Sequence, residues 1–320
     1  MKIPKLLFRL CTTVENLFTT ALVSMAFYIT TPIGITTDTL KLPKGSITNT
    51  INHLQNSGVK LSKIDIYLLA TLGQPKHGEL DIGIGIINRI DFLDKLTTAS
   101  EAIQIITLIP GETRPIFLED IAKRYKLDYK RLDSYYNQFS NYKEAGIIPD
   151  TYHVPKGIKE EKIISFLVEL SEKKYEKLAK KHLKRYDKKE WLKYLTIASI
   201  VQKESANSEE MPIVASVVYN RLKIDMALQM DGTLNYGKYS HTKVTPKRIK
   251  TDKSGFNTYA NKGLPPYPVC SVSIDAIEAA IKPATTKYLY FMRNEDGVHD
   301  FTDSYKEHLN NINRVKRARN

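Results

Sequence analysis

The hydrophobic and polar positions of the first half of the chain repeat one short pattern. An extended apolar run is followed by Pro and Gly and then by helical spacing, at residues 40–54, 106–125 and 152–167. Ser46 or Thr113 can cap the helix that follows, so the pattern predicts strand–turn–helix units. A second helical segment at 57–73 extends the first unit into a small strand–helix–helix module. Such units are typical of compact binding modules, and equally of α+β folds in general.

The second half of the chain has a different pattern of hydrophobic and polar residues. Helical spacing predicts helices over 190–205 and 208–222, whereas residues 225–265 are rich in Asn, Thr, Tyr and Gly. A helix from Ser273, a strand over 287–294, a turn leading to 297–302, and a basic terminal helix complete the pattern. The sequence therefore predicts an α+β domain in which the loops of 225–265 line a groove.

The N-terminal segment has the composition of a membrane anchor. Lys2, Lys5 and Arg9 precede a stretch, 16–37, that contains no charged residue. About 20 apolar residues span a bilayer, and basic residues before the span place the N-terminus in the cytoplasm. The alternative is a cleaved signal peptide with a small-residue site at 24–26. We favour the retained anchor, because apolar character continues beyond that site.

Net charge and cysteine content narrow the range of partners. The 320 residues carry a formal net charge of +13, which indicates a polyanionic partner such as nucleic acid, anionic lipid or an acidic cell-wall polymer. In the basic run 171–190 acids are interleaved, as on a solvated helix face. Cys11 and Cys270 stand far apart, and the sequence has no Cys/His spacing typical of zinc. We expect neither a metal nor another cofactor.

One glutamate stands on an apolar helical stripe. Ile197, Ile200 and Val201 recur at helical spacing, and the next position of the stripe is Glu204. Partial desolvation raises the pKa of a carboxyl group, which suits a general acid for glycosidic cleavage. By spacing alone, an exposed glutamate at a helix end is the better explanation of the position.

The loops after this helix supply groups that bind neutral sugars. Amides, hydroxyls and aromatic rings bind sugar polymers by hydrogen bonds and stacking, and the same residue types also satisfy their own turns. Neither a G-x-S-x-G motif nor an H-x-x-x-H spacing is present, which disfavours serine or zinc hydrolysis. The candidates in these loops are Gln229, Asp231, Thr233, Asn235, Tyr236, Asn257, Thr258 and Tyr259.

Several separated segments, in order, resemble the YceG-like (MltG) family of membrane-anchored endolytic murein transglycosylases. The resemblance runs through LPKGS, IPGET, IPDTYHVPKG, LTIASIVQKES, VASVVYNRL, LQMDGTLNYG, FNTYANKGLPPYP, YLYF and GVHDF. Together with the N-terminal span, it covers nearly the whole chain. It implies an N-terminal transmembrane helix, small LysM-like α/β subdomains, and a C-terminal α+β catalytic domain with an open glycan-binding groove.

The resemblance also assigns site residues. The family's catalytic glutamate corresponds to Glu204, while its neighbouring acid is replaced by Gln202. The family usually has Pro where Gly232 stands, and the segment after Pro266 lacks its Asn and Pro-Gly turn. These departures put loop shape in doubt more than the reaction. The resemblance implies substrate contacts for Gln229, Asp231, Thr233, Tyr236, Asn257, Thr258, Tyr259, Leu264, Pro265 and His299.

The domains that we predict follow from both arguments. They are a cytoplasmic tail (1–15), a transmembrane helix (16–37), a LysM-like module (38–105), a second α/β unit with a connector (106–188) and a catalytic domain (189–320). The implied enzyme sits in the cytoplasmic (inner) membrane with its catalytic domain outside the cytoplasm. It cleaves the MurNAc–GlcNAc bond of peptidoglycan strands, leaves 1,6-anhydro ends, and has cell-wall synthases as possible partners.

Two other functions fit the same residues. One is a muramidase-type hydrolase in which Asp231 is a second carboxylate. The other is a membrane-anchored scaffold that binds glycan without cleaving it. Nucleic-acid binding is not expected of an exported chain.

Overall fold

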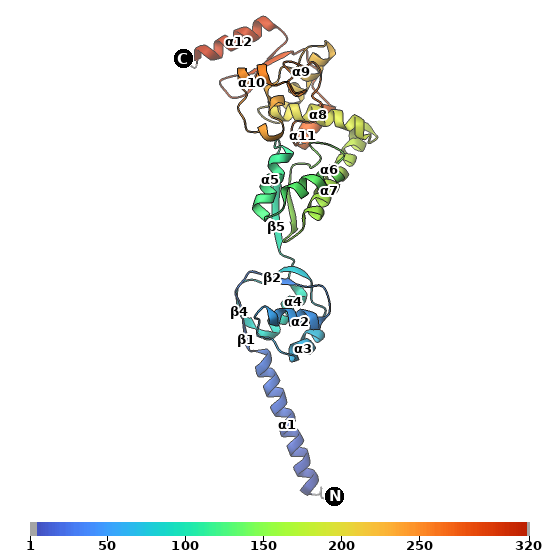
Figure 1. Ribbon diagram of the computed structural model, residues 1–320, viewed down its shortest axis with the longest axis vertical. Coiled ribbons are helices and arrows are strands. Elements are labelled where there is room, and N and C mark those ends of the chain that lie inside the picture. Colours follow the sequence, from blue (N-terminus) through green and yellow to red (C-terminus); the bar gives the residue numbers. More distant parts are fainter. Residues whose placement is uncertain (1–4, 319–320) are drawn as a thin grey trace. The chain divides into compact units, whose positions relative to one another are not determined.

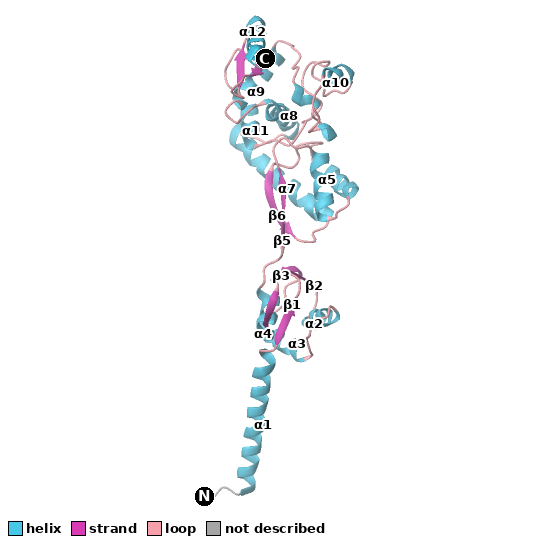
Figure 2. Ribbon diagram, turned by 90° about the vertical axis from the view of Figure 1, so that its left-hand side faces the viewer, coloured by secondary structure: helices cyan, strands magenta, loops and turns pink. Residues whose placement is uncertain are grey.

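The computed structural model of the chain describes residues 5–318, which divide into two compact units (Figures 1 and 2). Unit 1 consists of Met1–Gln104 and Pro155–Gly157, and unit 2 of Ile105–Val154 and Ile158–Asn320. Helices and strands mix in both units, so the predicted α+β class is confirmed. In the described part of the chain the strands form four two-stranded sheets.

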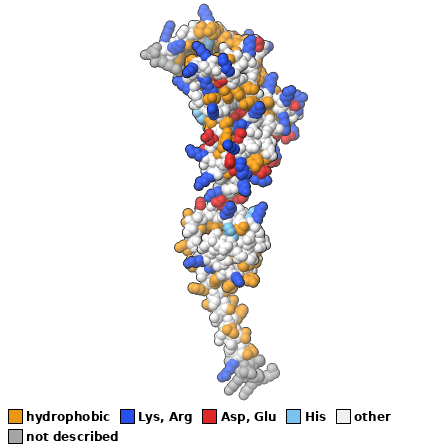
Figure 3. All heavy atoms as spheres, viewed as in Figure 1, with side chains coloured by type: hydrophobic (Ala, Val, Ile, Leu, Met, Phe, Trp, Pro, Cys, Tyr) orange, Lys and Arg blue, Asp and Glu red, His pale blue; other side chains and the backbone are white. Residues whose placement is uncertain are grey.

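The first helix, α1 (Lys5–Ile29), is long and apolar enough over Arg9–Ile29 to cross a membrane. Its hydrophobic side chains face outward along its length (Figure 3). The predicted span of 16–37 has the wrong bounds, because the helix ends at Ile29 and strand β1 (Pro32–Ile35) follows. Pro32 has no N–H to continue a helical ladder, so the charge-free stretch divides between two elements. Lys2, which supports the predicted orientation, lies outside the described residues.

Unit 1 packs two small antiparallel sheets against three helices. β1 pairs with β4 (Gly85–Asn88), and β2 (Thr39–Leu42) pairs with β3 (Gly78–Asp81). The helices are α2 (Ile47–Asn56), α3 (Ile64–Leu72) and α4 (Arg89–Thr98). The predicted cap is confirmed, since the Ser46 hydroxyl accepts the Asn49 N–H at the start of α2. The core of the unit contains Ile51, Leu54, Leu69, Leu80, Phe92, Leu93 and Leu96.

A buried ion pair joins the end of α1 to this unit. The Arg89 guanidinium contacts the Asp65 carboxylate at 2.8 Å, and both side chains are almost fully buried. The same Asp65 oxygen accepts the Tyr28 hydroxyl at 2.8 Å, and Arg89 lies over the Tyr28 ring. Arg89 also donates to the Thr31 hydroxyl. The last turn of α1 is therefore fixed to unit 1 by side chains, in addition to the chain itself.

Replacing Asp65 tests this network. Asp65→Asn removes the only carboxylate that Arg89 contacts in the described part of the chain and leaves a buried, uncompensated guanidinium. We expect the free energy of unfolding of unit 1 to fall by about 3 kcal/mol. Urea unfolding of the full chain in detergent measures it. Asp81→Asn, at an exposed position, is the control and changes the value by less than about 0.5 kcal/mol. Equal midpoints for both variants would contradict the assignment.

The first part of unit 2 places three helices beside one sheet. β5 (Ile103–Leu108) pairs with β6 (Asp150–Pro155), and the helices are α5 (Arg114–Tyr125), α6 (Tyr129–Phe139) and α7 (Glu160–Leu183). The expectation of a solvated basic face is confirmed on α7, where Lys173 and Lys180 pair with acids one turn away. Each of these two lysines is therefore balanced by an acid of the same helix.

Thr113 stands at the predicted N-cap position of α5, but its side chain does not cap the helix. Its hydroxyl donates instead to the Gly237 carbonyl at 2.7 Å. Instead the buried Glu144 carboxylate accepts the Arg114 N–H through both oxygens at 3.0 Å. A carboxylate at a helix N-terminus is favoured by the helix dipole, and this one comes from 30 residues further along the chain.

The rest of unit 2 surrounds one buried helix. α8 (Lys188–Glu204) packs against α9 (Met211–Lys223) and α11 (Ile274–Ile281). All residues from Leu195 to Val201 are buried, so the middle of α8 is covered on every side and not along one stripe. The remaining elements are two 3₁₀ turns, η1 (Asp231–Leu234) and η2 (Gly237–Tyr239), the helices α10 (Pro246–Thr251) and α12 (Tyr305–Ala318), and the hairpin β7 (Tyr290–Arg293) and β8 (His299–Thr302).

Candidate active site

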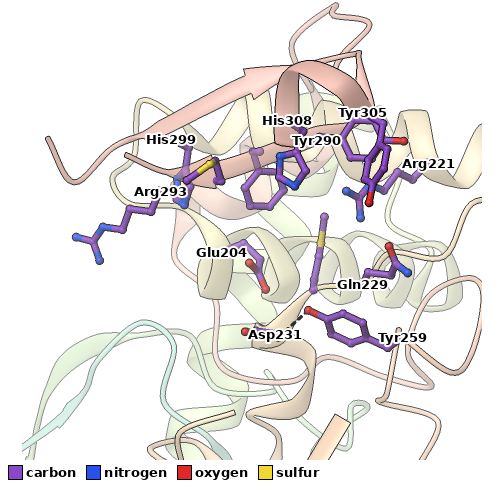
Figure 4. Close-up of a pocket in the computed structure, with 13 residues that line it drawn as sticks. Glu204, Arg221, Gln229, Asp231, Tyr259, Tyr290, Arg293, His299, Tyr305 and His308 are labelled. Carbon is purple, nitrogen blue, oxygen red and sulfur yellow. Dashed lines mark hydrogen bonds between the residues drawn. The ribbon is translucent and has the colours of Figure 1, made fainter. Parts of the chain in front are cut away.

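Glu204 is the last residue of α8, at the point where the helix leaves the core. The three polar residues of its final turn have different surroundings. The Gln202 amide oxygen accepts the Ser273 N–H at 3.0 Å, and the Lys203 ammonium donates to the Ser240 hydroxyl at 3.1 Å. The partly buried Glu204 carboxyl lines a cavity of about 400 Å³ (Figure 4). Of these three residues Glu204 alone lines the cavity, and Gln202 has a structural partner of its own.

The backbone of Gly232 holds the Glu204 carboxyl. Its N–H donates to Oε1 of Glu204 at 2.6 Å. A Cβ at this position would lie 2.5 Å from the Lys203 Cβ and 2.8 Å from the same Glu204 oxygen, so only glycine fits. A proline, which has no N–H, would also remove the hydrogen bond. Glycine at this position therefore gives the acid a backbone donor.

The surroundings of Glu204 favour its protonated form. Burial raises the pKa of Glu204 to about 7, and the hydrogen bond from the Gly232 N–H acts in the opposite direction. The charge of Asp231 raises the pKa further, whereas the charge of Arg221 lowers it. A carboxyl with a pKa near 7 can donate a proton and take one back at neutral pH. This is the property that acid–base chemistry at a glycosidic bond requires.

Asp231 and Tyr259 form a second polar group beside this acid (Figure 4). The Tyr259 hydroxyl donates to Oδ1 of Asp231 at 2.7 Å. Burial, the bond to Asp231 and the nearby carboxylates raise the pKa of Tyr259 far above its ordinary value, so its hydroxyl keeps its proton. Gln229 precedes them with a left-handed backbone, φ 49°, and lines the same cavity.

His299, the first residue of β8, enters the cavity with a carboxylate behind it. Nδ1 of His299 lies 2.7 Å from Oε2 of Glu210, and the His299 N–H donates to Oε1 of Glu210 at 2.7 Å. Burial alone would raise the pKa of Glu210, but the hydrogen bonds from His299 and from the Ala206 N–H, together with the charge of His299, lower it. Because Nδ1 is engaged, a ligand in the cavity would meet the ring through Nε2.

The structure brings five of the predicted site residues together. Glu204, Gln229, Asp231, Tyr259 and His299 all line the cavity, although they come from α8, two loops and β8. Apart from His299, the wall of the cavity that β7, β8 and α12 form was not predicted. The sequence of β7 matches a family motif and that of α12 is basic, but neither pattern indicates a site. The additional lining residues are Arg221, Met230, Tyr290, Phe291, Met292, Arg293, Tyr305 and His308.

Three other predicted residues lie beneath the cavity. Thr233, Asn257 and Thr258 are almost completely buried. The two threonine hydroxyls lie 3.0 Å apart, and Thr233 also donates to the Met230 carbonyl. The Asn257 amide donates to two carbonyls of the 249–252 segment. Their hydrogen bonds are therefore made within the loops, and the cavity lining does not include them.

The last three predicted residues belong to packed clusters. The Tyr236 ring stacks on Phe256 with centroids 4.2 Å apart. Leu264 packs against the core around α8, and Pro265 is buried in the same loop. None of the three is part of the cavity wall that contains Glu204.

The model of the YceG-like family matches residues 40–314. The chain belongs to the YceG-like family. A crystal structure of a yceG-like protein from Listeria monocytogenes has a TM-score of 0.56 and 26% identity, with 85% of this chain and 98% of that chain covered. The YceG-like fold is thereby shown for both units.

Curated relatives carry the name of an enzyme. A Bacillus subtilis protein called endolytic murein transglycosylase is 41% identical over 117 residues, which are 36% of this chain and 32% of the relative. A Streptococcus pneumoniae protein of the same name is 28% identical over 231 residues, 69% of this chain and 38% of the relative. The matched parts thus span only about a third of the length of these relatives.

The raised pKa of Glu204 predicts a pH-dependent stability. Between about pH 4.5 and 7 the native carboxyl retains a proton that the unfolded chain releases, so stability is lost as the pH rises through 7. Glu204→Gln removes this loss and can still accept the Gly232 N–H. We expect the variant to exceed the wild type by about 2 kcal/mol at pH 8, a value reduced for partial exposure, and to differ little at pH 4.5.

Urea unfolding of both proteins across this pH range measures the difference. Glu144, whose pKa burial also raises to about 7, is present in both proteins and cancels. The exposed Glu295→Gln is the control. A Glu204→Gln protein that is no more stable than the wild type at pH 8 would show that the acid is solvated.

Proposed function

We propose that this chain is an endolytic peptidoglycan transglycosylase in which Glu204 is the catalytic acid and base. The observation that supports this most is the carboxyl at the end of α8, with a pKa of about 7, on the wall of a 400 Å³ cavity. Family membership and the names of the curated relatives supply the reaction class. The substrate would be the MurNAc–GlcNAc bond of nascent glycan strands.

A single carboxyl suffices for this reaction. In the first half Glu204 gives its proton to the oxygen that bridges MurNAc and GlcNAc, and the bond from that oxygen to C1 breaks. In the second half the Glu204 carboxylate removes the proton of the MurNAc C6 hydroxyl, whose oxygen attacks C1. The products are a free GlcNAc C4 hydroxyl and a 1,6-anhydro MurNAc end, and water takes no part. A pKa near 7 suits both halves, because neither form of the group is strongly favoured at neutral pH.

The other cavity residues would hold the sugars. Gln229, Asp231 and His299 offer hydrogen-bonding groups, and the ring of Tyr259 offers a face for stacking. Thr233, Asn257 and Thr258 support these groups from below, together with Tyr236, Leu264 and Pro265 in the packed loops. In this proposal the cavity is part of an open groove along which a glycan strand lies.

A muramidase-type reaction is the second candidate, and the position of Asp231 favours it. Its charge acts on Glu204, so it is close enough to be considered as a second carboxylate. One of its oxygens is engaged by Tyr259, however, which would weaken it as a nucleophile or base. Products distinguish the two reactions, since hydrolysis leaves reducing ends and transglycosylation leaves anhydro ends.

Mass spectrometry of digested peptidoglycan tests both candidates. Glu204→Gln should lower anhydro-product release by at least about 10²-fold, because general acid–base catalysis contributes about that much or more. The exposed Glu295→Gln should leave it unchanged. Asp231→Asn should still give anhydro ends. Reducing ends that disappear in Asp231→Asn would establish the muramidase instead, and binding without cleavage by the wild type would indicate a scaffold.

Helix α1 would anchor the enzyme in the cytoplasmic membrane by a single span. Residues 38–105 would serve as a LysM-like module that binds glycan, 106–188 as a second unit and connector, and 189–320 as the catalytic domain. The support is the apolar length of α1 and its rigid attachment to unit 1 through Tyr28. An enzyme held there would meet strands as membrane-bound synthases release them.

An alkaline phosphatase fused to the C-terminus tests the orientation. Basic residues before the span predict an exported, active reporter. Removal of residues 9–29 should leave the reporter inactive in the cytoplasm. An inactive alkaline phosphatase on the full chain would refute the orientation. Nucleic-acid binding would then become a candidate function again.

A further inference from the structure

Arg221 is a buried cation without a counter-charge. The residue, on α9, is 7% exposed, and no ion pair within 4 Å involves it in the described part of the chain. The buried Asp65, by contrast, is paired with Arg89. An unpaired buried charge is costly, so its retention on a cavity wall indicates a ligand that brings the opposite charge.

The backbone holds the guanidinium in place. Nε of Arg221 donates to the Leu289 carbonyl at 2.6 Å, Nη1 donates to the Leu228 carbonyl, and the group lies over the Tyr290 ring. Figure 4 shows the guanidinium reaching toward the cavity between Tyr305 and Gln229. The orientation is therefore set before any ligand arrives, and the remaining N–H groups are available to it.

The carboxyl groups of the cavity do not neutralise this cation. Burial lowers the pKa of Arg221 and the charge of Glu204 opposes this change, but the two groups lie beyond ion-pair distance. With a pKa of about 7, Glu204 is also protonated in part at neutral pH. Asp231 accepts the Tyr259 hydroxyl. The wall formed by β7, β8 and α12 contributes aromatic rings and imidazoles to the cavity lining and, among the described residues, no carboxyl group. That side of the cavity consequently suits an anionic group next to the neutral sugar.

We propose that Arg221 forms a subsite for a carboxylate carried by the glycan strand. The inference rests on the proposed function. The sugar backbone of peptidoglycan offers no carboxylate there, whereas the stem peptides attached to the lactyl groups of MurNAc do. The planar guanidinium fork matches a carboxylate through two parallel hydrogen bonds. The enzyme therefore distinguishes strands with charged stems from strands without them.

The test compares rates on three substrates. They are uncross-linked strands with intact stem peptides, the same strands with their stem carboxylates converted to amides, and strands freed of stems by an amidase whose exposed lactyl carboxylates are likewise converted to amides. The wild type should cleave the first about tenfold or more faster than the second and third, since a hydrogen-bonded charge pair has that effect on affinity or rate. The ratio of rates on two substrates by one protein does not depend on the folded fraction.

Three variants locate the effect. Arg221→Gln should reduce the ratio to near one, and Arg221→Lys, which keeps the charge, should restore part of it. Arg293→Gln is the matched control. Arg293 lines the same cavity, but it donates to the Gly297 carbonyl and its guanidinium extends away from the other lining residues (Figure 4), so the ratio should stay within about twofold of the wild type.

Several outcomes would overturn the inference. A wild type that cleaves all three substrates equally needs no carboxylate subsite, even if no Arg221 variant folds. Equal loss on all substrates in Arg221→Gln, with a shifted pH profile, would make Arg221 an electrostatic support of Glu204. Loss of the ratio in Arg293→Gln alone would place the subsite elsewhere. A folded wild type that cleaves none of the substrates contradicts the proposed function itself.

Discussion

A carboxyl group withdrawn from water must stay neutral or obtain compensating contacts, and the arrangement of unit 2 around Glu204 follows from this constraint. Helix α8 is buried through Val201, so its last turn emerges next to the core with one acid at its end. A loop approaches closely enough for the Gly232 N–H to hold that acid, which is feasible only because residue 232 has no side chain. Burial thus raises the pKa of Glu204, and the hydrogen bond from the Gly232 N–H lowers it.

The loops around the cavity depend on a distant segment of the chain. Glu112 and Ser271 are joined by a backbone hydrogen bond of 2.8 Å, and Gly111 donates back to Ser271 at 3.0 Å. Thr113 holds the Gly237 carbonyl, and the Glu112 carboxylate contacts His241 at 2.8 Å. The turn between β5 and α5 therefore fixes both sides of the region 237–271. These contacts add to the hydrogen bonds that Asn257 and Thr258 make within the loops.

Unit 1 also contains a buried carboxyl group, but this one has a paired cation. Asp65 is as buried as any residue of the protein, yet it is compensated by Arg89, Tyr28 and a backbone N–H. These contacts, all made to Oδ2 of Asp65, connect the end of α1 to the rest of unit 1. Glu204 has one backbone hydrogen bond and Arg221 has no carboxylate partner among the described residues. Glu204 is therefore available for proton transfer, and Arg221 is available to bind an anion. The degree of compensation separates structural charges from those available for function.

The sequence by itself determined the elements whose causes are local. Turn residues and periodicity gave the strand–turn–helix units, the charge-free stretch gave the apolar helix, and the stripe through Ile197 and Val201 pointed to Glu204. Motif order gave the family. Contacts between distant residues were decided only by the tertiary structure. Capping of α5 by Glu144, the Gly232 bond to Glu204 and the unpaired Arg221 each depend on segments brought together by packing, and no local pattern encodes their distance. The same limit separates Gln229, which reaches the cavity, from Thr233, which is buried beneath it, because burial is a property of the packed chain.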